Sequence, residues 1–167
     1  MAKHSPDIVV RPAQSDSDLD GARALIREYA DSLGVDLCFQ NVETELRELP
    51  GEYAAPYGAL LVALVDGAFA GCCGLRSLHS VDYANAGEMK RLYVRPQFRG
   101  LGLGRQLSEA ILDSAHAAGF DCVLLDTLDD MEAARALYQE LGFAEIPPYY
   151  YNPIAGAHYL KADLGAR

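Results

Sequence analysis

Three glycines at alternating positions, directly before a segment with helical periodicity, constrain this chain more than any other feature. They are Gly100, Gly102 and Gly104 in the stretch VRPQFRGLGLGRQLSEAI (94–111). Glycine has no β-carbon, so the backbone of such a loop can approach a ligand closely and point free amide N–H groups at it. The helix after the loop adds its own unpaired N–H groups and the positive end of its dipole. The stretch therefore predicts a strand, a loop and a helix whose N-terminus binds an anion such as phosphate or pyrophosphate.

The charges around the loop agree with an anionic ligand, because no Asp or Glu occurs between Glu88 and Glu109. Two phosphate-binding motifs are excluded by the residues after Gly104. A P-loop requires Gly-Lys-Ser/Thr, but Arg105 and Gln106 stand there, and the dinucleotide fingerprint GxGxxG requires glycine at position 105. A glycine-rich turn that only packs closely is the structural alternative. Five of the 14 basic residues fall in this window and are expected to concentrate positive charge at the loop: Lys90, Arg91, Arg95, Arg99 and Arg105.

Hydrophobic periodicity divides the rest of the chain into helices and strands. Apolar residues recur at gaps of three and four in the expected helices, and short apolar runs between turn residues predict strands. Asp66-Gly67 between two such runs is a strong hairpin signal. The order β-α-α-β-β-β-α-β-α-β, with a further short strand at 143–146, predicts one α/β domain over 1–167, a mixed sheet with helices on both faces. The expected strands are 8–14, 59–65, 69–75, 87–94, 122–128 and 157–164; the helical stripes are 19–33, 39–49, 103–118 and 134–141, the first capped by Ser17.

Composition excludes several classes of function. A net charge of −10 argues against a nucleic-acid partner. The longest apolar region (58–75) is interrupted by Asp66 and by glycines, and the N-terminal MAKHSPD lacks the apolar core of a signal peptide, so no membrane association is expected. The four histidines show no ligand spacing, so no metal is expected. The four cysteines (Cys38, Cys72, Cys73 and Cys122) are expected to be reduced, mostly buried thiols, with Cys72 and Cys73 on opposite sides of a strand. These features together indicate a cytoplasmic enzyme or binding module.

The hexapeptide Arg99-Gly100-Leu101-Gly102-Leu103-Gly104 matches Gln/Arg-x-x-Gly-x-Gly/Ala, the coenzyme A pyrophosphate loop of the GCN5-related N-acetyltransferases (GNAT superfamily). Together with EMKRLYVRPQFRGLGLGRQL (88–107) and EAARALYQELGF (132–143), in the family's order and separation, it makes the chain resemble this superfamily over nearly its whole length. The resemblance implies the acyl-CoA N-acyltransferase fold. In that fold a mostly antiparallel sheet is splayed between its fourth and fifth strands, here 88–94 and 122–128, around the pantetheine arm of acetyl-CoA.

The resemblance also implies the coenzyme contacts. Backbone groups of Leu92, Tyr93 and Val94 would contact the pantetheine and the thioester carbonyl. The pyrophosphate would be wrapped by Arg99, Gly100, Leu101, Gly102, Leu103, Gly104 and Arg105. One departure puts a coenzyme contact in doubt: where many members have an asparagine early in the last helix, residues 129–131 are Asp-Asp-Met.

Two residues take catalytic roles under this resemblance. Tyr138, in ALYQELGF, stands where the family's tyrosine faces the coenzyme sulfur and protonates the departing thiolate; from periodicity alone it is a core tyrosine on an apolar stripe. Glu88 stands where several members carry a glutamate that removes the amine proton through water. Its alternative is a strand-entry carboxylate paired with Arg91 or Lys90, and some members need only water as the base.

The acceptor is the part of the reaction that the sequence leaves open. In the family, the segments corresponding to 33–53 and 146–156 line the acceptor side. The first carries an excess of acidic residues, which either favours a cationic amine or forms a solvated helix face. The tyrosines at 149–151 are expected either to wall a small substrate or to cover the splayed sheet. The acidic residues are Asp36, Glu43, Glu45, Glu48 and Glu52, against Arg47.

The sequence thus predicts an N-acetyltransferase that moves an acetyl group from acetyl-CoA to a primary amine of a small molecule or protein. Attack is direct, with help from a general base and a general acid. The alternatives are a non-catalytic coenzyme A-binding sensor, transfer of a longer acyl group, and transfer to a hydroxyl. Whether the chain forms a homodimer is left open.

Overall fold

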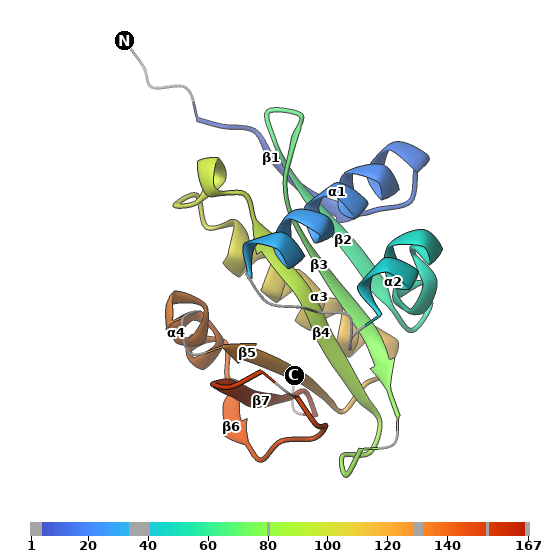
Figure 1. Cartoon of the computed structure of the whole chain (residues 1–167), viewed down its shortest axis with the longest axis vertical. Coiled ribbons are helices and arrows are strands. Elements are labelled where there is room, and N and C mark those ends of the chain that lie inside the picture. The colour runs from blue at the N-terminus through green and yellow to red at the C-terminus, as the bar shows by residue number, and fades with distance from the viewer. Residues whose placement is uncertain (1–4, 34–40, 80, 129–131, 153, 166–167) are drawn as a thin grey trace.

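The computed structural model (Figure 1) describes residues 5–33, 41–79, 81–128, 132–152 and 154–165. Its strands and helices follow the predicted order. In chain order they are β1 (Ile8–Pro12), α1 (Asp16–Ser32), α2 (Val42–Glu48), β2 (Ala59–Val65), β3 (Ala68–Leu78), β4 (Ala86–Val94), α3 (Leu103–Ala118), β5 (Cys122–Leu128), α4 (Glu132–Glu140), β6 (Ala144–Ile146) and β7 (Ala157–Asp163), with short 3₁₀ turns at Gly51–Tyr53 and Pro96–Phe98.

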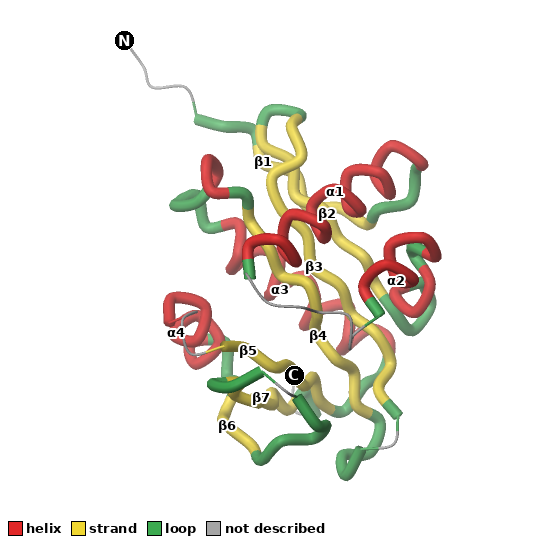
Figure 2. The backbone as a smooth tube through the Cα atoms, viewed as in Figure 1, coloured by secondary structure: helices red, strands yellow, loops and turns green. Residues whose placement is uncertain are grey.

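One mixed sheet of seven strands, in the order β1-β2-β3-β4-β5-β7-β6, forms the centre of the fold. Every neighbouring pair is antiparallel except β4 and β5. These two parallel strands pair only from Ala86↔Cys122 to Glu88↔Leu124, and beyond that point they diverge, as Figure 2 shows. The predicted splay between the fourth and fifth strands is therefore confirmed.

A bulge in β4 lies just past the last of these pairs. Lys90 is opposite Gly74 and Tyr93 is opposite Cys72, so two residues of β4 face one residue of β3. Arg91 within this bulge has φ +62°, in the left-handed region that non-glycine residues rarely adopt. A bulge bends its strand and increases the local twist, which accounts for the way β4 leaves β5.

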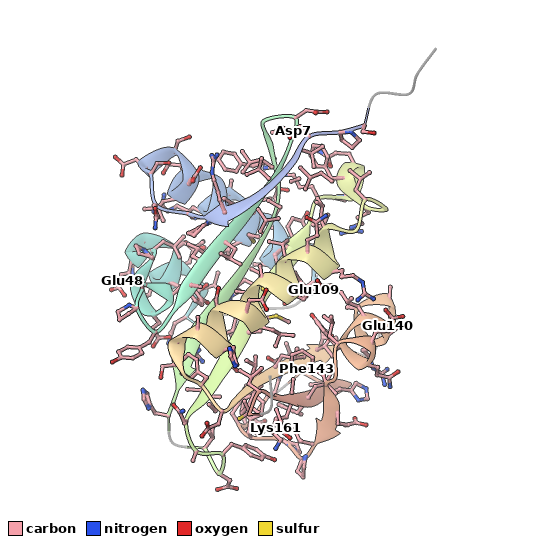
Figure 3. All side chains as sticks on the ribbon, turned by 180° about the vertical axis from the view of Figure 1, so that it is seen from behind. Asp7, Glu48, Glu109, Glu140, Phe143 and Lys161 are labelled. Atoms are coloured by element: carbon pink, nitrogen blue, oxygen red, sulfur yellow. The ribbon has the colours of Figure 1, made fainter. Side chains whose placement is uncertain are left out.

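Helices cover both faces of the sheet, as predicted. In Figure 1, α1 and α2 lie over one face, and Figure 3 shows α3 across the other, with α4 and its labelled Glu140 beside it. Each face has its own apolar core: α1 and α2 pack on residues such as Val62 and Cys72, and α3 on residues such as Ala63 and Cys73. Cys72 and Cys73 thus face opposite ways and are both buried and unbridged, while Cys38 lies outside the described residues.

The local predictions hold with small corrections. The Asp66-Gly67 hairpin is present, with both residues at positive φ. Ser17 is not the cap of α1; Ser15 is, because its side chain accepts the Asp18 amide. The first strand ends at Pro12, two residues early, and the second helix begins at Val42; Phe39 lies outside the described residues.

Candidate active site

An open groove of about 590 Å³ runs along the end of β4, the glycine loop, the start of α3 and the adjacent face of α4. All but one of the ten predicted coenzyme contacts line this groove; Leu101, which is 38% exposed, does not. The other nine line it: Leu92, Tyr93, Val94, Arg99, Gly100, Gly102, Leu103, Gly104 and Arg105.

The loop leads into the N-terminus of α3, which has no side-chain cap. Gly100 and Gly102 have φ of +88° and +80°, and Gly102 is the N-cap of a helix with no side-chain cap hydrogen bond. A β-carbon at Gly104 would meet only Leu137 Cδ2, at 3.7 Å. The first N–H groups of an α-helix have no partner within it, so uncapped donors and the helix dipole suit an anion at this end of the groove.

Two of the five basic residues stand at this loop. The Arg99 Nε group donates to the Val94 carbonyl at 3.1 Å. Arg105 pairs with Glu109 at 3.6 Å and with Glu140 on α4. Both residues are exposed and line the groove.

The other three basic residues are elsewhere, so the expectation of a single positive patch is wrong for them. Arg95 is engaged by Glu28 of α1, with Nη2 2.6 Å from Oε2. Lys90 and Arg91 line two other cavities and are not among the groove residues. Residues adjacent in a strand point to opposite faces, and the bulge changes that alternation, so nearness in sequence did not predict nearness in space.

A small cavity of about 50 Å³ occupies the opening between β4 and β5. Leu92 lines both this cavity and the groove, so the two adjoin. Tyr138 of α4 is 6% exposed, lines the cavity, and packs edge-on against Phe143 with ring centroids 5.6 Å apart. Its hydroxyl has no hydrogen-bond partner among the described residues. Burial raises the pKa of Tyr138, so the hydroxyl carries its proton at neutral pH.

Glu88 lies at the last β4–β5 pair and is 1% exposed. Its Oε1 accepts from Arg76 Nε at 2.8 Å and its Oε2 from the Tyr149 hydroxyl at 2.7 Å. Burial alone would raise the pKa of this carboxyl, but Lys90, Arg76 and Tyr149 outweigh it and hold the pKa below its usual value. Neither of the pairings expected for Glu88 is its main contact: Lys90 is 4.0 Å away, and Arg91 binds Glu45 instead.

A third cavity, of about 340 Å³, opens on the side of Glu88 and the Tyr149–Tyr151 segment. Tyr149 packs edge-on against Tyr159 at 5.4 Å, whereas Tyr151 is 85% exposed. Lys90 lines both this cavity and the small one beside Tyr138, so the two adjoin at that side chain.

The acidic residues expected on the acceptor side are partly neutralised by arginines. Arg91 binds Glu45 through two bonds, at 3.0 and 3.1 Å. Arg76 binds Glu52 at 2.6 Å, and Glu43 pairs with Arg27 on α1 at 3.0 Å. Asp36 lies outside the described residues. Three of these acids therefore have arginine partners, which reduces the anionic charge open to a cationic substrate.

Asp126 of β5 is a site residue that sequence reasoning missed. It lines the small cavity with Tyr138, and its Oδ2 accepts from the Tyr150 hydroxyl at 2.7 Å and from Asn152 Nδ2 at 3.4 Å. Its Oδ1 has no hydrogen-bond partner among the described residues. The available signal was a lone carboxylate in the otherwise apolar run CVLLDTL. Arg76 was missed because nothing local marks it as the partner of Glu88.

Among the described residues there is neither a candidate metal-binding group nor a helix able to span a membrane. They contain no group of three His, Cys, Asp or Glu side chains placed to hold a metal ion. No helix in this part of the chain is both long enough and apolar enough to cross a membrane.

Comparisons with known proteins agree with the geometry. The model of the acetyltransferase (GNAT) family matches residues 23–143. An uncharacterized N-acetyltransferase of Schizosaccharomyces pombe is 38% identical over 159 residues, 95% of this chain and 96% of that protein. Human N-acetylaspartate synthetase is 30% identical over 123 residues, 73% of this chain and 37% of that protein. The structure of the Salmonella typhimurium protein yncA, which contains acetyl-CoA, superposes with a TM-score of 0.66 over 96% of this chain and 95% of that one. The two sequences are 21% identical, so this comparison shows similarity of fold.

Proposed function

Because the chain belongs to the GNAT acetyltransferase family, we propose that it transfers the acetyl group of acetyl-CoA to a primary amine. The observation that carries this proposal is that the groove at the uncapped glycine loop adjoins, at Leu92, the small cavity lined by Tyr138. Together the two have an anion-binding end, an apolar middle and a proton donor at the inner end. The similarity to N-acetylaspartate synthetase supports a small-molecule acceptor.

In this proposal the coenzyme lies along the groove. The amides at the start of α3 hydrogen-bond the pyrophosphate, with Arg99 and Arg105 at its edge. The pantetheine arm replaces β5 as the neighbour of the diverging end of β4, where the backbone at Leu92–Val94 has no β5 partner. The thioester then reaches the small cavity beside Tyr138.

The transfer makes an N–C bond and breaks the C–S bond of the thioester. A protonated alkylamine, with a usual pKa of about 10.4, must first lose a proton. Attack gives a tetrahedral oxyanion, which hydrogen-bond donors stabilise most when they are already in position. The departing thiolate takes the proton of the Tyr138 hydroxyl, which has no competing partner among the described residues. The second proton, which the nitrogen loses as the tetrahedral intermediate becomes an amide, returns to Tyr138 through water. The coenzyme leaves as a free thiol, and the amine leaves as an amide.

Two carboxylates compete for the role of base. Glu88 has both oxygens occupied, by Arg76 and Tyr149, and its pKa is lowered, so it would act through water or through Tyr149. Asp126 shares a cavity with Tyr138 and keeps one oxygen without a partner among the described residues. The geometry favours Asp126 for direct contact with the amine, and Glu88 for holding Tyr149 and Arg76.

The test follows free thiol release from acetyl-CoA with a panel of amines, beside calorimetric titration of coenzyme A. We expect coenzyme binding, and thiol release that requires both the amine and the Tyr138 hydroxyl. Binding without transfer to any amine would favour the sensor alternative. Acetyl-CoA, longer acyl thioesters and hydroxyl acceptors in the same assay distinguish the remaining alternatives. Absence of coenzyme binding would refute the proposal.

A further inference from the structure

The ammonium group of Lys90 is a buried charge that its surroundings satisfy poorly. The side chain is 8% exposed, and its one ion pair in the described part of the chain is with Glu88 Oε1, at 4.0 Å. That oxygen already accepts from Arg76, whose Nη2 and Nε are 2.7 and 2.8 Å away. An ammonium has three donors, and a buried charge is costly unless it is paired and hydrogen-bonded. Burial accordingly lowers the pKa of Lys90, against the opposing effects of Glu88 and Asp126.

The other cations beside Lys90 already have carboxylate partners. Arg76 binds Glu88 and Glu52, and Arg91 binds Glu45 through two hydrogen bonds. Each guanidinium is therefore balanced by acids of the protein itself. Lys90 differs, because the carboxylate within its reach is held by another group at a shorter distance. The arrangement leaves its charge for an anion that comes from outside.

The position of Lys90 indicates which molecule would bring that anion. Its side chain lines both the small cavity beside Tyr138 and the cavity of about 340 Å³ next to the tyrosine segment. The larger volume is at the lower end of the range of small-molecule sites, about 300–1,000 Å³. The coenzyme groove does not include Lys90. An anion at this ammonium thus belongs to a molecule that occupies the cavity beside the tyrosine segment rather than the coenzyme groove.

The same small cavity also offers a place for a positive charge. Asp126 lines it with Lys90, and its Oδ1 has no partner among the described residues. An ammonium near Asp126 and a carboxylate near Lys90 are the two ends of a zwitterion. We propose that Lys90 binds a carboxylate of the acceptor, so that the preferred acceptor is an amino acid or another small amine with a nearby acid group. This inference rests on the acetyl transfer proposed above and narrows its substrate class.

The experiment compares acceptors that differ only in the acid group. Thiol release from acetyl-CoA is measured with the twenty protein amino acids, with their α-carboxamides and with the corresponding decarboxylated amines. We expect at least one free amino acid whose kcat/KM exceeds that of its carboxamide and its amine by about 10²-fold, as loss of one buried charged partner produces. If amines are acetylated but no acid is preferred over its derivatives, the inference is overturned while the proposed function stands. If coenzyme A does not bind, the proposed function itself fails.

Variants then assign the preference to Lys90. In Lys90→Met the acid-to-carboxamide ratio should fall toward 1, mainly through KM, and Lys90→Arg should recover part of it. Lys161→Met, on β7 and outside these cavities, is the matched control and should keep the ratio. Calorimetric titration of the best acid into protein saturated with coenzyme A should show binding that Lys90→Met loses. If Lys90→Met instead lowers kcat equally for acid, carboxamide and amine, Lys90 acts as a base and the inference is wrong.

Discussion

The three glycines of the loop should separate into two that the backbone conformation requires and one that it does not. Gly102, with φ +80°, is the N-cap of α3, whereas Gly104 lies inside the first helical turn with no positive φ. The informative perturbation is the same small change, glycine to alanine, at each position. A larger residue such as valine at Gly102 would both strain the backbone and fill space in the loop. Loss of coenzyme binding in that variant could not be assigned to one of these two effects.

The expected effects on stability have opposite signs. Alanine in the left-handed conformation costs about 1–2 kcal/mol, so Gly102→Ala should destabilise the protein by that amount. Alanine inside a helix is favoured over glycine by about 0.5–1 kcal/mol, and a β-carbon at Gly104 would meet only Leu137 Cδ2, at the ordinary contact distance of 3.7 Å. Gly104→Ala should therefore stabilise the protein. In a protein of this size 1 kcal/mol shifts the melting temperature by about 2–4 °C.

The effects on the coenzyme should also differ. In Gly102→Ala the loop should relax away from the conformation that aims the first amides of α3 into the groove, and coenzyme A affinity should fall at least tenfold. Gly104→Ala keeps those amides in place, so its affinity should stay within about threefold of wild type. Calorimetric titration of coenzyme A and thermal unfolding, on both variants, are the assays. If Gly104→Ala lost the coenzyme as severely as Gly102→Ala, or if Gly102→Ala were as stable as wild type, the conformational reasoning would be refuted.

Three further predictions concern the catalytic groups. Tyr138→Phe should lower kcat by about 10²-fold with little change in coenzyme affinity. The decrease in kcat should be smaller with a thioester of a more acidic thiol, because that thiolate needs less help from a proton donor. Full activity of the variant would leave Tyr138 with a packing role only. If Asp126 is the base, Asp126→Asn should lower the rate at neutral pH, and part of the rate should return at high pH, where more amine is neutral. Glu88→Gln should show neither change. The reverse pattern in the two pH–rate profiles would assign the proton transfer to Glu88. Because the folded pKa of Glu88 lies below its unfolded value, the stability it contributes is present above the unfolded pKa and is lost as pH falls through the folded pKa. The free energy of unfolding, measured with urea at pH 7 and below pH 4.5, should therefore fall less on acidification in Glu88→Gln than in wild type. An equal fall in both proteins would contradict the pairing.

Local sequence determined the elements and the glycine loop. The helical stripes, the Asp66-Gly67 turn and the glycine spacing are each short-range signals, because hydrophobic period and turn chemistry act over a few residues. The family resemblance, carried by the motif at 88–107, implied ten coenzyme contacts, and nine of these residues line one groove. The N-cap of α1 was misassigned by two residues because Ser15 and Ser17 are both suitable caps, and only the backbone conformation chooses between them.

Tertiary structure decided which charges meet. The five basic residues near the glycines predicted one patch, yet Arg95 lies against Glu28 and Arg91 against Glu45, partners 67 and 46 residues away. Ion pairing depends on distance through space, and that distance is set by strand order and by the bulge at Arg91, a non-glycine residue at φ +62° with no local signature. The same bulge bends β4 away from β5 and opens the cavity that brings Lys90, Asp126 and Tyr138 together from three separate elements. Short-range periodicity reports which side of an element is apolar, but only the packed sheet determines what its polar side chains face.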